Sequence, residues 1–541
     1  MARLAVKDVK SRADKAWARK RGWNPLLREA YEFSQPQTNP YHNAPEGATT
    51  KTTQEGQSKT NRVFDGTLIN STTKLANRLQ SELCPPFQNW AKMVPGPFVA
   101  ANLKDQAGRE LEPITAALFA AIQLSNFDTA INEWFLELVT AGTACMMVQE
   151  GNDEKPVIYR TINQSQIALA EGPWGEVWEV HRKFTLRGVL IKPTWKNAKI
   201  SASLKKAIED KPDEEFYITE ATYYDDDAKV WYYDVCVNGA GVEDERIVET
   251  EYDESPWVIA RWLKACGEVQ GRSPVMMALA DAKTLNKLKE LVLKNGSLAV
   301  SGVWMARDDG VINPNQIRIF PGAVIRVKAT GGTAGPSLAR LDVGGKLDMA
   351  QLVAQDLTMA IKAALFDKGL PDEAGPVRSV TEILQRLKEL QQDLGAPFGR
   401  VTMEGLVPIL QKTLYHLSKK GVVPTVKGQT LKLNSGYIQV QFQSPLAQQQ
   451  NLSEVENAVK WMQLCQSFGQ EAFALGVKVE DAPSYFGRRM GVASELMRTT
   501  DERSKLQQMV GVLVKQQMAA QTGAGPVPAN ANTGQGIPVA A

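Results

Sequence analysis

The chain has 541 residues, enough for two to four domains with buried cores. Apolar residues make up 43% and charged residues 23%, which is typical of soluble globular proteins. The formal net charge of +2 argues against a protein that coats nucleic acid through positive charge alone.

Cysteine and histidine usage narrows the possible chemistry. The cysteines form no CxxC pair, so we expect buried or half-buried free thiols in a reducing compartment; they are Cys84, Cys145, Cys236, Cys266 and Cys465. The histidines do not cluster along the chain, which argues against a zinc site or a histidine-based catalytic pair; they are His42, His181 and His416. The first 20 residues lack an apolar core, and no run approaches about 18 apolar residues. We therefore expect neither a signal peptide nor a membrane span, and a soluble, intracellular protein.

The first part of the chain predicts helices. Apolar residues recur at helical spacing in four segments, the last of which stops at Gly142; the segments are 5–33, 62–83, 110–124 and 127–141. Residues 34–60 are polar and rich in Pro, Asn and Thr, so they predict a flexible arm. Glu133 and Glu137 share one face of the fourth helix, and we expect both at the surface.

Residues 143–262 change to a period of two, which predicts a β-rich module. Asn238-Gly239 is a turn signal between two of the expected strands, which cover 217–224, 230–237 and 246–252. The lysine-rich residues 192–215 predict an exposed, partly helical insertion. Asp225, Asp226 and Asp227 favour a solvated turn over a metal site.

A long helix is expected after this module. A strand-like run ends at Arg261-Trp262, and residues 274–295 then have the composition of a regular helix, about 33 Å long. Ser273 is a suitable N-cap, and Pro274 suits the first helical position because no N–H is needed there. Asn295-Gly296 predicts the end of the helix.

Shorter segments follow. Residues 297–345 predict a mixed region with a Gly-rich loop at 331–336 and strands over 303–305, 317–320 and 324–327. A second helix is expected over 347–366, and the Gly- and Pro-containing residues 367–378 cannot form regular helix. Ser379 and Glu382 predict a capping box for a third helix. Gly395-Ala396-Pro397 breaks or kinks that helix before it continues to Leu417.

The C-terminal part predicts little further strand. Residues 437–442 alternate like a strand, and the chain is Gln-rich and helical from residue 445 onward. Residues 522–541 are of low complexity and predict disorder.

No motif supports an active site. Gly344-Gly345-Lys346 has the core of a phosphate-binding loop, but Arg340 and Leu347 occupy the positions that need Gly and Ser or Thr. The sequence also lacks the GxSxG motif of nucleophilic serine enzymes, the HExxH motif of zinc proteases and a GxGxxG dinucleotide-binding motif after a strand. We therefore expect a protein that is not an enzyme, with no catalytic residue, no cofactor and no bound metal.

Several separate stretches, in a consistent order over most of the chain, resemble the portal (head-to-tail connector) proteins of T7-like short-tailed bacteriophages. The most specific stretch is a P…RW…GE…GRSP block; the matching residues are Pro256, Arg261-Trp262, Gly267-Glu268 and Gly271-Arg272-Ser273-Pro274. The weaker matches before it are Trp23, Tyr31, Pro36, Pro85-Pro86, Trp90, Glu133 and Gly142-Thr143-Ala144. The weaker matches after it are Leu285-Asn286, Thr381-Glu382, Arg386, Arg400, Glu404, Pro408, Gly491, Glu495-Leu496 and Arg498.

The resemblance implies an α+β, mainly helical portal fold with a β-rich wing, a two-helix stem, a small α/β clip and a helical C-terminal crown. It implies these boundaries: wing 1–272, with the arm 34–60 and the β-rich region 143–262; first stem helix 273–296; clip 297–345; second stem helix 346–366; tunnel loop 367–378; second part of the wing 379–444; crown 445–521; disordered tail 522–541.

The resemblance also assigns roles to individual residues. The tunnel loop that approaches DNA would contain Asp367, Lys368, Gly369, Asp372, Glu373 and Arg378. The stem helices would contribute Ser273, Pro274, Lys283, Lys287, Asp356 and Lys362. The clip, which would face the terminase and later the tail, would contribute Trp304, Arg307, Asp308, Asp309 and Arg318.

The implied function is that of a ring, usually of about twelve subunits, at one vertex of the capsid. Double-stranded DNA would be packaged and ejected through the ring, which also serves as the platform for the tail. Expected partners are further copies of the chain, the major capsid and scaffolding proteins, the terminase large subunit, the tail adaptor and internal core proteins, with no membrane. The location would be the virion after assembly in the host cytoplasm.

Elementary physics is consistent with a passive conduit. Near-neutral charge avoids strong phosphate binding, and the tunnel loop has one excess negative charge, which a ring would repeat. We expect Lys283, Lys287, Lys289 and Lys294 to face solvent or pair between subunits. The apolar faces at 279–292 and 352–365 would either close the ring or pack only on each other. The alternatives are a nucleic-acid-processing enzyme with a β-rich insert and a monomeric adaptor that binds through its Gln-rich helices.

Overall fold

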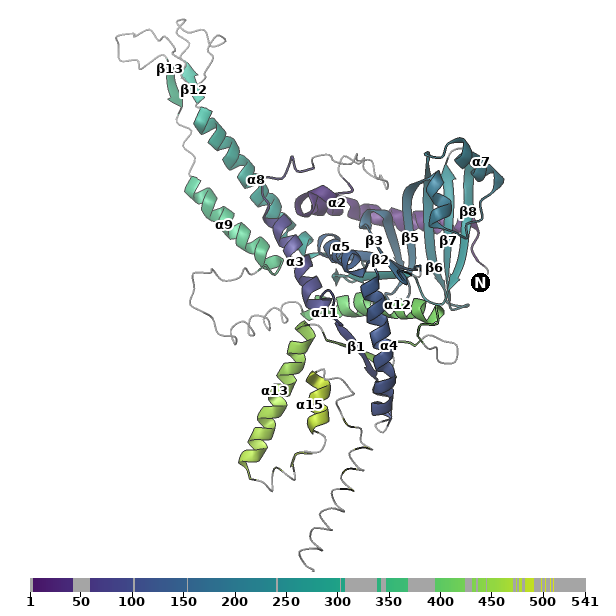
Figure 1. Ribbon diagram of the computed structural model, residues 1–541. Helices are drawn as coiled ribbons and strands as arrows, with labels where there is room; N and C mark the ends of the chain where they lie inside the picture. Colours follow the sequence, from purple (N-terminus) through teal and green to yellow (C-terminus); the bar gives the residue numbers. More distant parts are fainter. Residues whose placement is uncertain are drawn as a thin grey trace, which may run out of the picture. The chain divides into compact units, whose positions relative to one another are not determined.

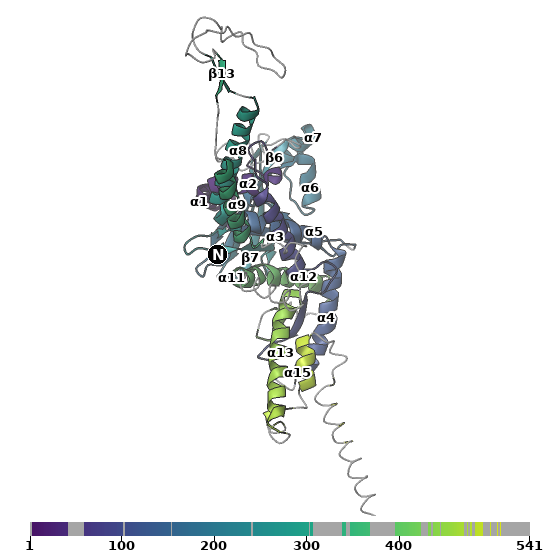
Figure 2. The same ribbon diagram turned by 90° about the vertical axis from the view of Figure 1, so that its left-hand side faces the viewer.

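The protein is described by a computed structural model, shown in two orientations (Figures 1 and 2). The structure describes residues 3–41, 59–100, 103–152, 154–239, 242–301, 303–306, 338–341, 347–367, 395–423, 431–433, 436–443, 445–469 and 482–490, with a few single positions beyond 469. The chain divides into two compact units. The first comprises Met1–Trp90, Ala116–Leu433 and Ser444–Leu446, and the second comprises Ala91–Thr115, Asn434–Gln443 and Ala447–Ala541.

The first unit begins with two helices, α1 (Val6–Lys20) and α2 (Asn24–Ser34), which the 3-10 turn η1 (Arg21–Trp23) joins. This confirms the helical segment expected over 5–33. The buried positions of α1 recur at helical spacing and form one face; they are Val9, Ala13, Ala16, Trp17 and Lys20. A second 3-10 turn, η2 (Pro36–Thr38), lies within the segment expected to be a flexible arm; residues 42–58 of that arm lie outside the described residues.

Two further helices, α3 (Thr67–Leu83) and α5 (Phe127–Ala141), pack on each other. Helix α3 begins at Thr67 rather than at residue 62; just before it, the Asp65 carboxylate accepts a hydrogen bond from the Thr67 N–H (3.1 Å), which favours a local turn there. Helix α5 ends as expected at Gly142, whose φ of +76° favours glycine. Helix α4 (Lys104–Leu124) contributes residues to both units.

The β-rich module contains a five-stranded antiparallel sheet in the order β4-β5-β6-β7-β8. Its strands are β4 (Ile167–Glu171), β5 (Val177–Arg187), β6 (Glu215–Asp225), β7 (Val230–Gly239) and β8 (Val242–Tyr252). The turn expected at Asn238-Gly239 is wrong by position: both residues belong to β7, and Gly239, with a φ of +135°, pairs with Val242 at the start of β8. Asp225 to Asp227 form the expected turn, in which the Asp225 carboxylate accepts from the Asp227 N–H (3.0 Å).

Residues alternate between the two faces of this sheet, so each face has its own cover. One face, with Phe216, Ile218 and Val235, packs on the insertion that holds α6 (Ile191–Thr194) and α7 (Ala202–Asp210). Trp195 and Leu204 anchor this insertion in the core, while most other residues of 192–215 are exposed, so the exposed, partly helical insertion is confirmed. The opposite face, with Ala221, Tyr223 and Tyr232, packs on α1.

A three-stranded sheet, in the order β3-β2-β9, lies beside the insertion side of the larger sheet. Its strands are β2 (Thr143–Glu150), β3 (Val157–Ile162) and β9 (Trp257–Arg261). The first six residues of β2 are buried. Strand β2 therefore forms the centre of the first unit, and it follows directly from the left-handed turn at Gly142.

The long central helix α8 (Pro274–Ser301) packs beside α9 (Leu347–Ala364), as Figure 1 shows. Between them, β12 (Val303–Ala306) pairs antiparallel with β13 (Leu338–Leu341). The expected stop at Gly296 is wrong: its φ is not positive, and the helix continues over residues that tolerate helical conformation. The expected helix over 347–366 ends slightly early, at Ala364.

The remaining helix of the first unit is built from three pieces. Helix α11 (Gly395–Arg400), a π-helix (Val401–Leu406) and α12 (Val407–Lys419) follow one another without a break. Gly395-Ala396-Pro397 therefore begins a described helix; the residues just before it, with Ser379 and Glu382, lie outside the described residues. Gly421, with a φ of +73°, follows the end of α12.

The second unit contains a pair of strands from distant parts of the chain. Strand β1 (Ala91–Pro95) pairs antiparallel with β14 (Ile438–Phe442), which confirms the strand expected over 437–442. Helices α13 (Pro445–Ser467) and α15 (Ala482–Met490) follow, and they confirm helical structure after residue 445. Residues 522–541 lie outside the described residues. The second unit also includes residues 91–115, which the resemblance assigns to the wing.

Within the described part of the chain, no single helix has both the length and the apolar composition that a membrane crossing needs, and one bent helix pair passes only when its two members are taken together.

Candidate functional site

The base of the α8–α9 hairpin brings together the best-matched sequence block. Helix α8 begins at Pro274, and the Ser273 hydroxyl accepts a hydrogen bond from the Met276 N–H (2.9 Å). Ser273 is fully buried, so its cap satisfies a donor that has no access to water. Both roles expected for Ser273 and Pro274 at the start of this helix are confirmed.

Two glycines fix the chain just before the cap. A Cβ at Gly142 would lie 2.4 Å from the Gly271 carbonyl oxygen, and a Cβ at Gly271 would lie 2.2 Å from the Gly142 carbonyl oxygen. The Thr143 hydroxyl accepts from the Gly271 N–H (2.8 Å), and the Gly142 carbonyl accepts from the Trp262 N–H (2.8 Å). The end of α5 and the start of α8 are therefore in backbone contact that only glycine allows.

Arg261, at the end of β9, connects three elements. Its guanidinium donates two bonds to the Glu404 carboxylate (3.1 and 3.0 Å), one to Glu171 (2.6 Å) and one to the Gly175 carbonyl (3.2 Å). Arg261 is 5% exposed, so these bonds replace water around a buried charge. Glu404 lies in the π-helix, where Gly405 lets the backbone approach the Trp134 ring (2.5 Å from an added Cβ).

Helix α3 holds both helices of the hairpin. The Asn286 side chain of α8 accepts from the N–H groups of Phe64 and Asp65 (2.6 and 3.2 Å) and donates to the Arg62 carbonyl (2.9 Å). Asp367, just after α9, accepts from the Ser71 hydroxyl (2.9 Å) and pairs with Lys74 (3.4 Å). The first residue of the expected tunnel loop thus faces α3 in the single chain.

Helix α9 ends in an unusual cap. The Asp367 N–H donates to the Lys362 carbonyl (2.8 Å), and the Phe366 N–H donates to the Ala363 carbonyl (3.1 Å). This is a Schellman arrangement, in which glycine normally occupies the left-handed position. Here Phe366 occupies it with a φ of +54°, and its ring packs against Trp262 (6.5 Å between centroids). The packing on Trp262 offsets the backbone strain.

The lysines of α8 pair within their own chain. Lys283 pairs with Glu29 (2.9 Å), Lys287 and Lys294 both pair with Glu290 (2.9 and 2.6 Å), and Lys289 pairs with Asp65. All four also keep solvent exposure. Each lysine already has an intrachain partner, and the expectation that most of them face solvent or pair between subunits stays a prediction. Asp356 and Lys362 of α9 are exposed.

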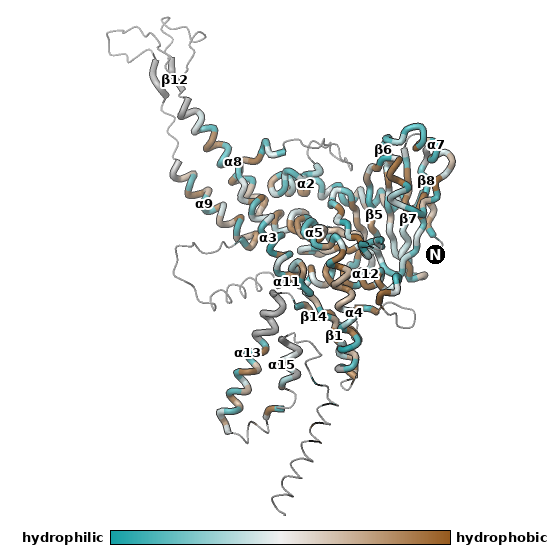
Figure 3. Tube along the Cα trace, viewed as in Figure 1, coloured by the Kyte–Doolittle hydropathy of each residue, from teal (hydrophilic) through white to brown (hydrophobic). Residues whose placement is uncertain are grey.

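The outer part of the hairpin has a different character. Apolar side chains are buried near the base, as Leu279, Leu285, Ile361 and Leu365 are. Further out, large apolar side chains are exposed, and Figure 3 shows hydrophobic positions recurring along both helices. The exposed ones are Leu291 and Leu293 of α8, and Met349, Leu352, Val353 and Met359 of α9; Met277, in the first turn of α8, is also exposed. The two apolar faces thus pack on each other only in part.

A buried polar cluster lies behind the base, and here the expectation for Glu137 is wrong. Glu133 is exposed, but the Glu137 carboxylate accepts from the Tyr31 hydroxyl (2.5 Å), Asn163 Nδ2 (2.7 Å) and the Gln164 N–H (3.3 Å). Removal from water raises the pKa of Glu137 to about 7. Burial likewise lowers the pKa of Lys20 to about 7, although its ammonium donates to the carbonyls of Gln164 and Ile167.

The structure describes only some of the other expected site residues. Trp304 lies in β12 opposite Arg340. The remaining clip residues, Arg307, Asp308, Asp309 and Arg318, lie outside the described residues, as do Lys368, Gly369, Asp372, Glu373 and Arg378 of the loop. In the described part of the chain, no group of three or more His, Cys, Asp or Glu side chains is placed to hold a metal ion. Cys266 is exposed, unlike the half-buried or buried thiols expected.

Sequence reasoning missed Lys20 and Asp65. A signal for Lys20 was present, since it follows Ala13, Ala16 and Trp17 at helical spacing and so lies on the buried face of α1. Asp65 gives no such signal, because its role depends on α8, more than 200 residues away in the sequence. Its spacing to Thr67 predicts at most a local turn.

Comparison with known proteins supports the same family. A model of the family described as bacteriophage head to tail connecting protein matches residues 6–497. A probable portal protein of Bordetella phage BPP-1 is 22% identical over 417 residues, covering 73% of this chain and 72% of the relative. The portal protein of Enterobacteria phage T3 is 20% identical over 477 residues (83% and 81%), and that of Escherichia phage T7 is 21% identical over 361 residues (65% of each).

A solved structure described as the virion of a native gene transfer agent particle matches with a TM-score of 0.34 and 11% identity, over 79% of this chain and 91% of the other. The family match spans most of the sequence and includes the residues that meet at the base of the hairpin. The chain therefore belongs to the family of bacteriophage head-to-tail connecting proteins, which are structural components of the virion.

Proposed function

We propose that this chain is a portal protein whose copies close into a ring through the outer faces of α8 and α9. The observation that carries the proposal is the exposed apolar surface of the hairpin. On α9, Met349, Leu352, Val353 and Met359 recur at helical spacing on the side away from α8, while Ile361 is fully buried. A contiguous exposed apolar face on a soluble protein is typical of an interaction site.

The two outer faces are different, which favours a ring over a two-fold dimer. Helix α8 adds exposed Lys287 and Lys294, which share the single carboxylate of Glu290 and leave one excess positive charge, whereas α9 carries exposed Asp356. Contact between α9 of one copy and α8 of the next is therefore heterologous and complementary in charge. Heterologous contacts generate rings when the rotation closes. The family resemblance supports about twelve subunits.

The ring would hold a channel for double-stranded DNA, with the hairpin as its wall. The loop that contains Lys368, Gly369, Asp372, Glu373 and Arg378 would approach the duplex, and its excess negative charge would limit phosphate binding. The strand pair β12–β13 would support the clip residues Trp304, Arg307, Asp308, Asp309 and Arg318. The clip would meet the terminase large subunit and later the tail adaptor. Major capsid, scaffolding and internal core proteins would contact the rest of the ring.

The decisive experiment is a measurement of mass by light scattering together with negative-stain electron microscopy of the full chain. We expect rings of about twelve subunits with an axial hole. The double variant Leu352→Glu and Met359→Glu should yield free subunits, because it places carboxylates in an apolar contact. Val189→Glu is the matched control, since Val189 is also exposed but lies outside the hairpin. A parent chain that stays monomeric or dimeric at high concentration contradicts the proposal, and tests of nuclease and nucleotide hydrolysis would follow.

A further inference from the structure

One end of the five-stranded sheet exposes an unusual group of side chains. The β4–β5 turn and the β6–β7 turn lie at the same end, because the strands are antiparallel neighbours in chain order. Trp174, in the first turn, is 86% exposed. Next to it, three half-buried aromatic rings form a row: Trp178 lies 5.1 Å from Tyr224, and Tyr224 lies 5.1 Å from Trp231.

The turn that carries Trp174 is held firmly. The Gly172 N–H donates to the Glu176 carbonyl (2.8 Å), and the Trp178 ring lies 2.4 Å from the position of an added Cβ at Gly172. Arg261 donates to the Gly175 carbonyl, and Glu171 beside the turn pairs with Arg261 and Lys264 (2.6 and 2.5 Å). A fixed turn loses little freedom when its exposed indole is buried by a partner.

The same end is acidic. Glu176 and Asp226 are exposed, and neither has a partner among the described residues. Asp225 and Asp227 belong to the second turn, together with Lys229, and Lys264 lies beside the Trp174 turn, where it pairs with Glu171. We name this surface the acidic–aromatic face and define it by Trp174, Glu176, Trp178, Tyr224, Asp226 and Trp231. It repels phosphates and attracts a basic surface.

The chain itself carries a matching basic surface on the outer side of α1. Lys7, Lys15 and Arg19 are exposed and have no partner among the described residues, whereas Lys10 is paired with Asp244. A shallow hollow of about 480 Å³ runs along this side; it is lined by Lys7, Lys10, Ser11, Asp14, Lys15 and Ala18. We name this surface the basic face and define it by Lys7, Ser11, Lys15, Ala18 and Arg19.

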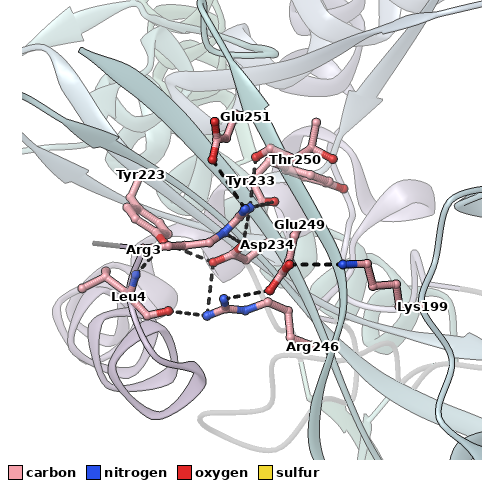
Figure 4. A network of polar contacts seen from close by, with 10 residues as sticks. All are labelled: Arg3, Leu4, Lys199, Tyr223, Tyr233, Asp234, Arg246, Glu249, Thr250 and Glu251. Atoms are coloured by element: carbon pink, nitrogen blue, oxygen red, sulfur yellow. Dashed lines mark hydrogen bonds and ion pairs between the residues drawn. The ribbon is translucent and has the colours of Figure 1, made fainter. Parts of the chain in front are cut away.

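Helix α1 cannot swing freely, so the basic face is also fixed. Figure 4 shows Arg3 donating to the buried Asp234 (2.9 Å) and to the carbonyls of Tyr233 and Thr250 (3.2 and 3.1 Å). Arg246 pairs with the other oxygen of Asp234 (3.6 Å) and donates to the Leu4 carbonyl. At the other end of α1, Lys20 donates to the carbonyls of Gln164 and Ile167.

Within one copy, the Lys15–Arg19 end of the basic face lies apart from the Trp174 turn. That end of α1 leads to Lys20, which binds at Ile167, the first residue of β4. The Trp174 turn follows Glu171, the last residue of β4, so the strand separates the two by about 13–17 Å. A contact between Trp174 and the Lys15–Arg19 end therefore requires a second copy.

We propose that the acidic–aromatic face of one copy docks on the basic face of the next copy, with Trp174 in the hollow beside α1. Lysine and arginine over the indole give cation–π attraction, and Glu176 and Asp226 meet the unpaired cations. The contact is heterologous, as ring closure needs. It rests on the proposed ring and adds a second zone of contact far from the hairpin in sequence.

Cysteine cross-linking tests the contact directly. In a Cys266→Ser background, Trp174→Cys and Ala18→Cys are combined in one chain, rings are oxidised, and the products are separated without reductant. We expect a ladder of covalent oligomers up to the full ring, and no ladder from either single cysteine variant. Rings that form normally but give no ladder overturn this contact while leaving the ring intact. A parent chain that forms no ring overturns the proposed ring, and this inference with it.

Substitutions provide an independent measure. Trp174→Ala should raise the subunit concentration at which rings dissociate by about tenfold or more, and Tyr217→Ala is the control because Tyr217 is exposed on the same sheet. Lys15→Glu and Glu176→Lys should each weaken the ring, and combining them should restore it, because the charges exchange across every contact. No effect of Trp174→Ala and no rescue would overturn the proposal. Loss of duplex DNA binding by Lys15→Glu with an unchanged ring would instead assign the basic face to nucleic acid.

Discussion

The base and the outer part of the α8–α9 hairpin differ in which side chains are buried. At the base, polar groups are buried and bonded within the chain: Ser273 caps α8, Asn286 binds the start of α3, and Arg261 binds Glu404. In the outer part, apolar side chains such as Leu352 and Met359 are exposed without cover. The polar groups of the base are satisfied within a single chain, whereas in the proposed ring a neighbouring copy would cover the outer part. Rigidity and assembly are thus assigned to different segments of the same helices.

Among the substitutions at the base and in the outer part of the hairpin, replacement of Arg261 should lower the stability of the chain most. Arg261→Met leaves Glu404 and Glu171 without their buried partner, so we expect the free energy of unfolding to fall by about 3–5 kcal/mol. Chemical unfolding of the full chain measures this change. Arg187→Met is the control, because the Arg187–Asp213 pair is exposed (3.4 Å) and should matter little. A similar small effect in both variants would show that the base does not depend on Arg261.

The glycine contact at the base gives the next largest effect. Gly142→Ala places a Cβ 2.4 Å from the Gly271 carbonyl and requires a left-handed conformation, so we expect about 2–4 kcal/mol of destabilisation. Gly267→Ala separates the two causes. Gly267 also has a positive φ (+83°), but an added Cβ meets nothing within 4 Å, so about 1 kcal/mol is expected. Equal losses in the two variants would mean that backbone strain alone accounts for the effect.

The buried cluster behind the base predicts a pH dependence. The pKa of Glu137 is raised to about 7 in the folded chain, so the folded state holds a proton that the unfolded state releases near its ordinary value of 4.5. This contribution to stability is therefore lost as pH rises from about 4.5 to 7. Glu137→Gln mimics the protonated form and should remove this fall, worth about 2 kcal/mol between pH 5 and 7.

Unfolding measured at pH 5, 6 and 7 for the parent and the Gln variant tests this prediction. Lys20 responds in the opposite sense above neutral pH, because its pKa is lowered to about 7 and stability returns as pH rises toward its ordinary value of 10.5. Parallel pH profiles for the parent and Glu137→Gln would contradict the raised pKa.

The smallest effect on single-chain stability is expected in the outer part of the hairpin. Leu352→Ser removes an apolar side chain that is already exposed, so unfolding should change by less than about 0.5 kcal/mol at concentrations where chains do not associate. Leu285→Ser, at a fully buried position of α8, should cost several times more. A large loss with Leu352→Ser would show that this side chain stabilises the single chain after all.

Local signals predicted the parts of the fold that depend on local physics. The cap at Ser273-Pro274, the stop at Gly142 and the turn at Asp225 to Asp227 each rest on backbone preferences that a short segment reveals. The stop expected at Gly296 failed because a glycine ends a helix only where it adopts the left-handed conformation, and packing beside α9 favours continuation. The family resemblance identified Asn286 but not its role.

Parts of the site that depend on distant pairing could not be predicted. Strand β1 pairs with β14, more than 340 residues away in the sequence, and the pattern of apolar residues in either strand does not identify its partner. The sequence predicted Glu137 at the surface because it shares one helix face with Glu133; Tyr31 and Asn163, which come from other elements, instead cover and bind its carboxylate. Apolar residues at helical spacing predicted an apolar face on α9, but the sequence alone could not show which residues of that face pack against α8.

The position of α3 has a mechanical consequence. Asp65, just before α3, binds Asn286 of α8, and about two turns further along, Ser71 and Lys74 bind Asp367 at the end of α9. A force that pushes or pulls on the tip of the hairpin is therefore delivered through both arms to the same short stretch of one helix. The hairpin would tilt as a single lever about that stretch, with no sliding of α8 against α9.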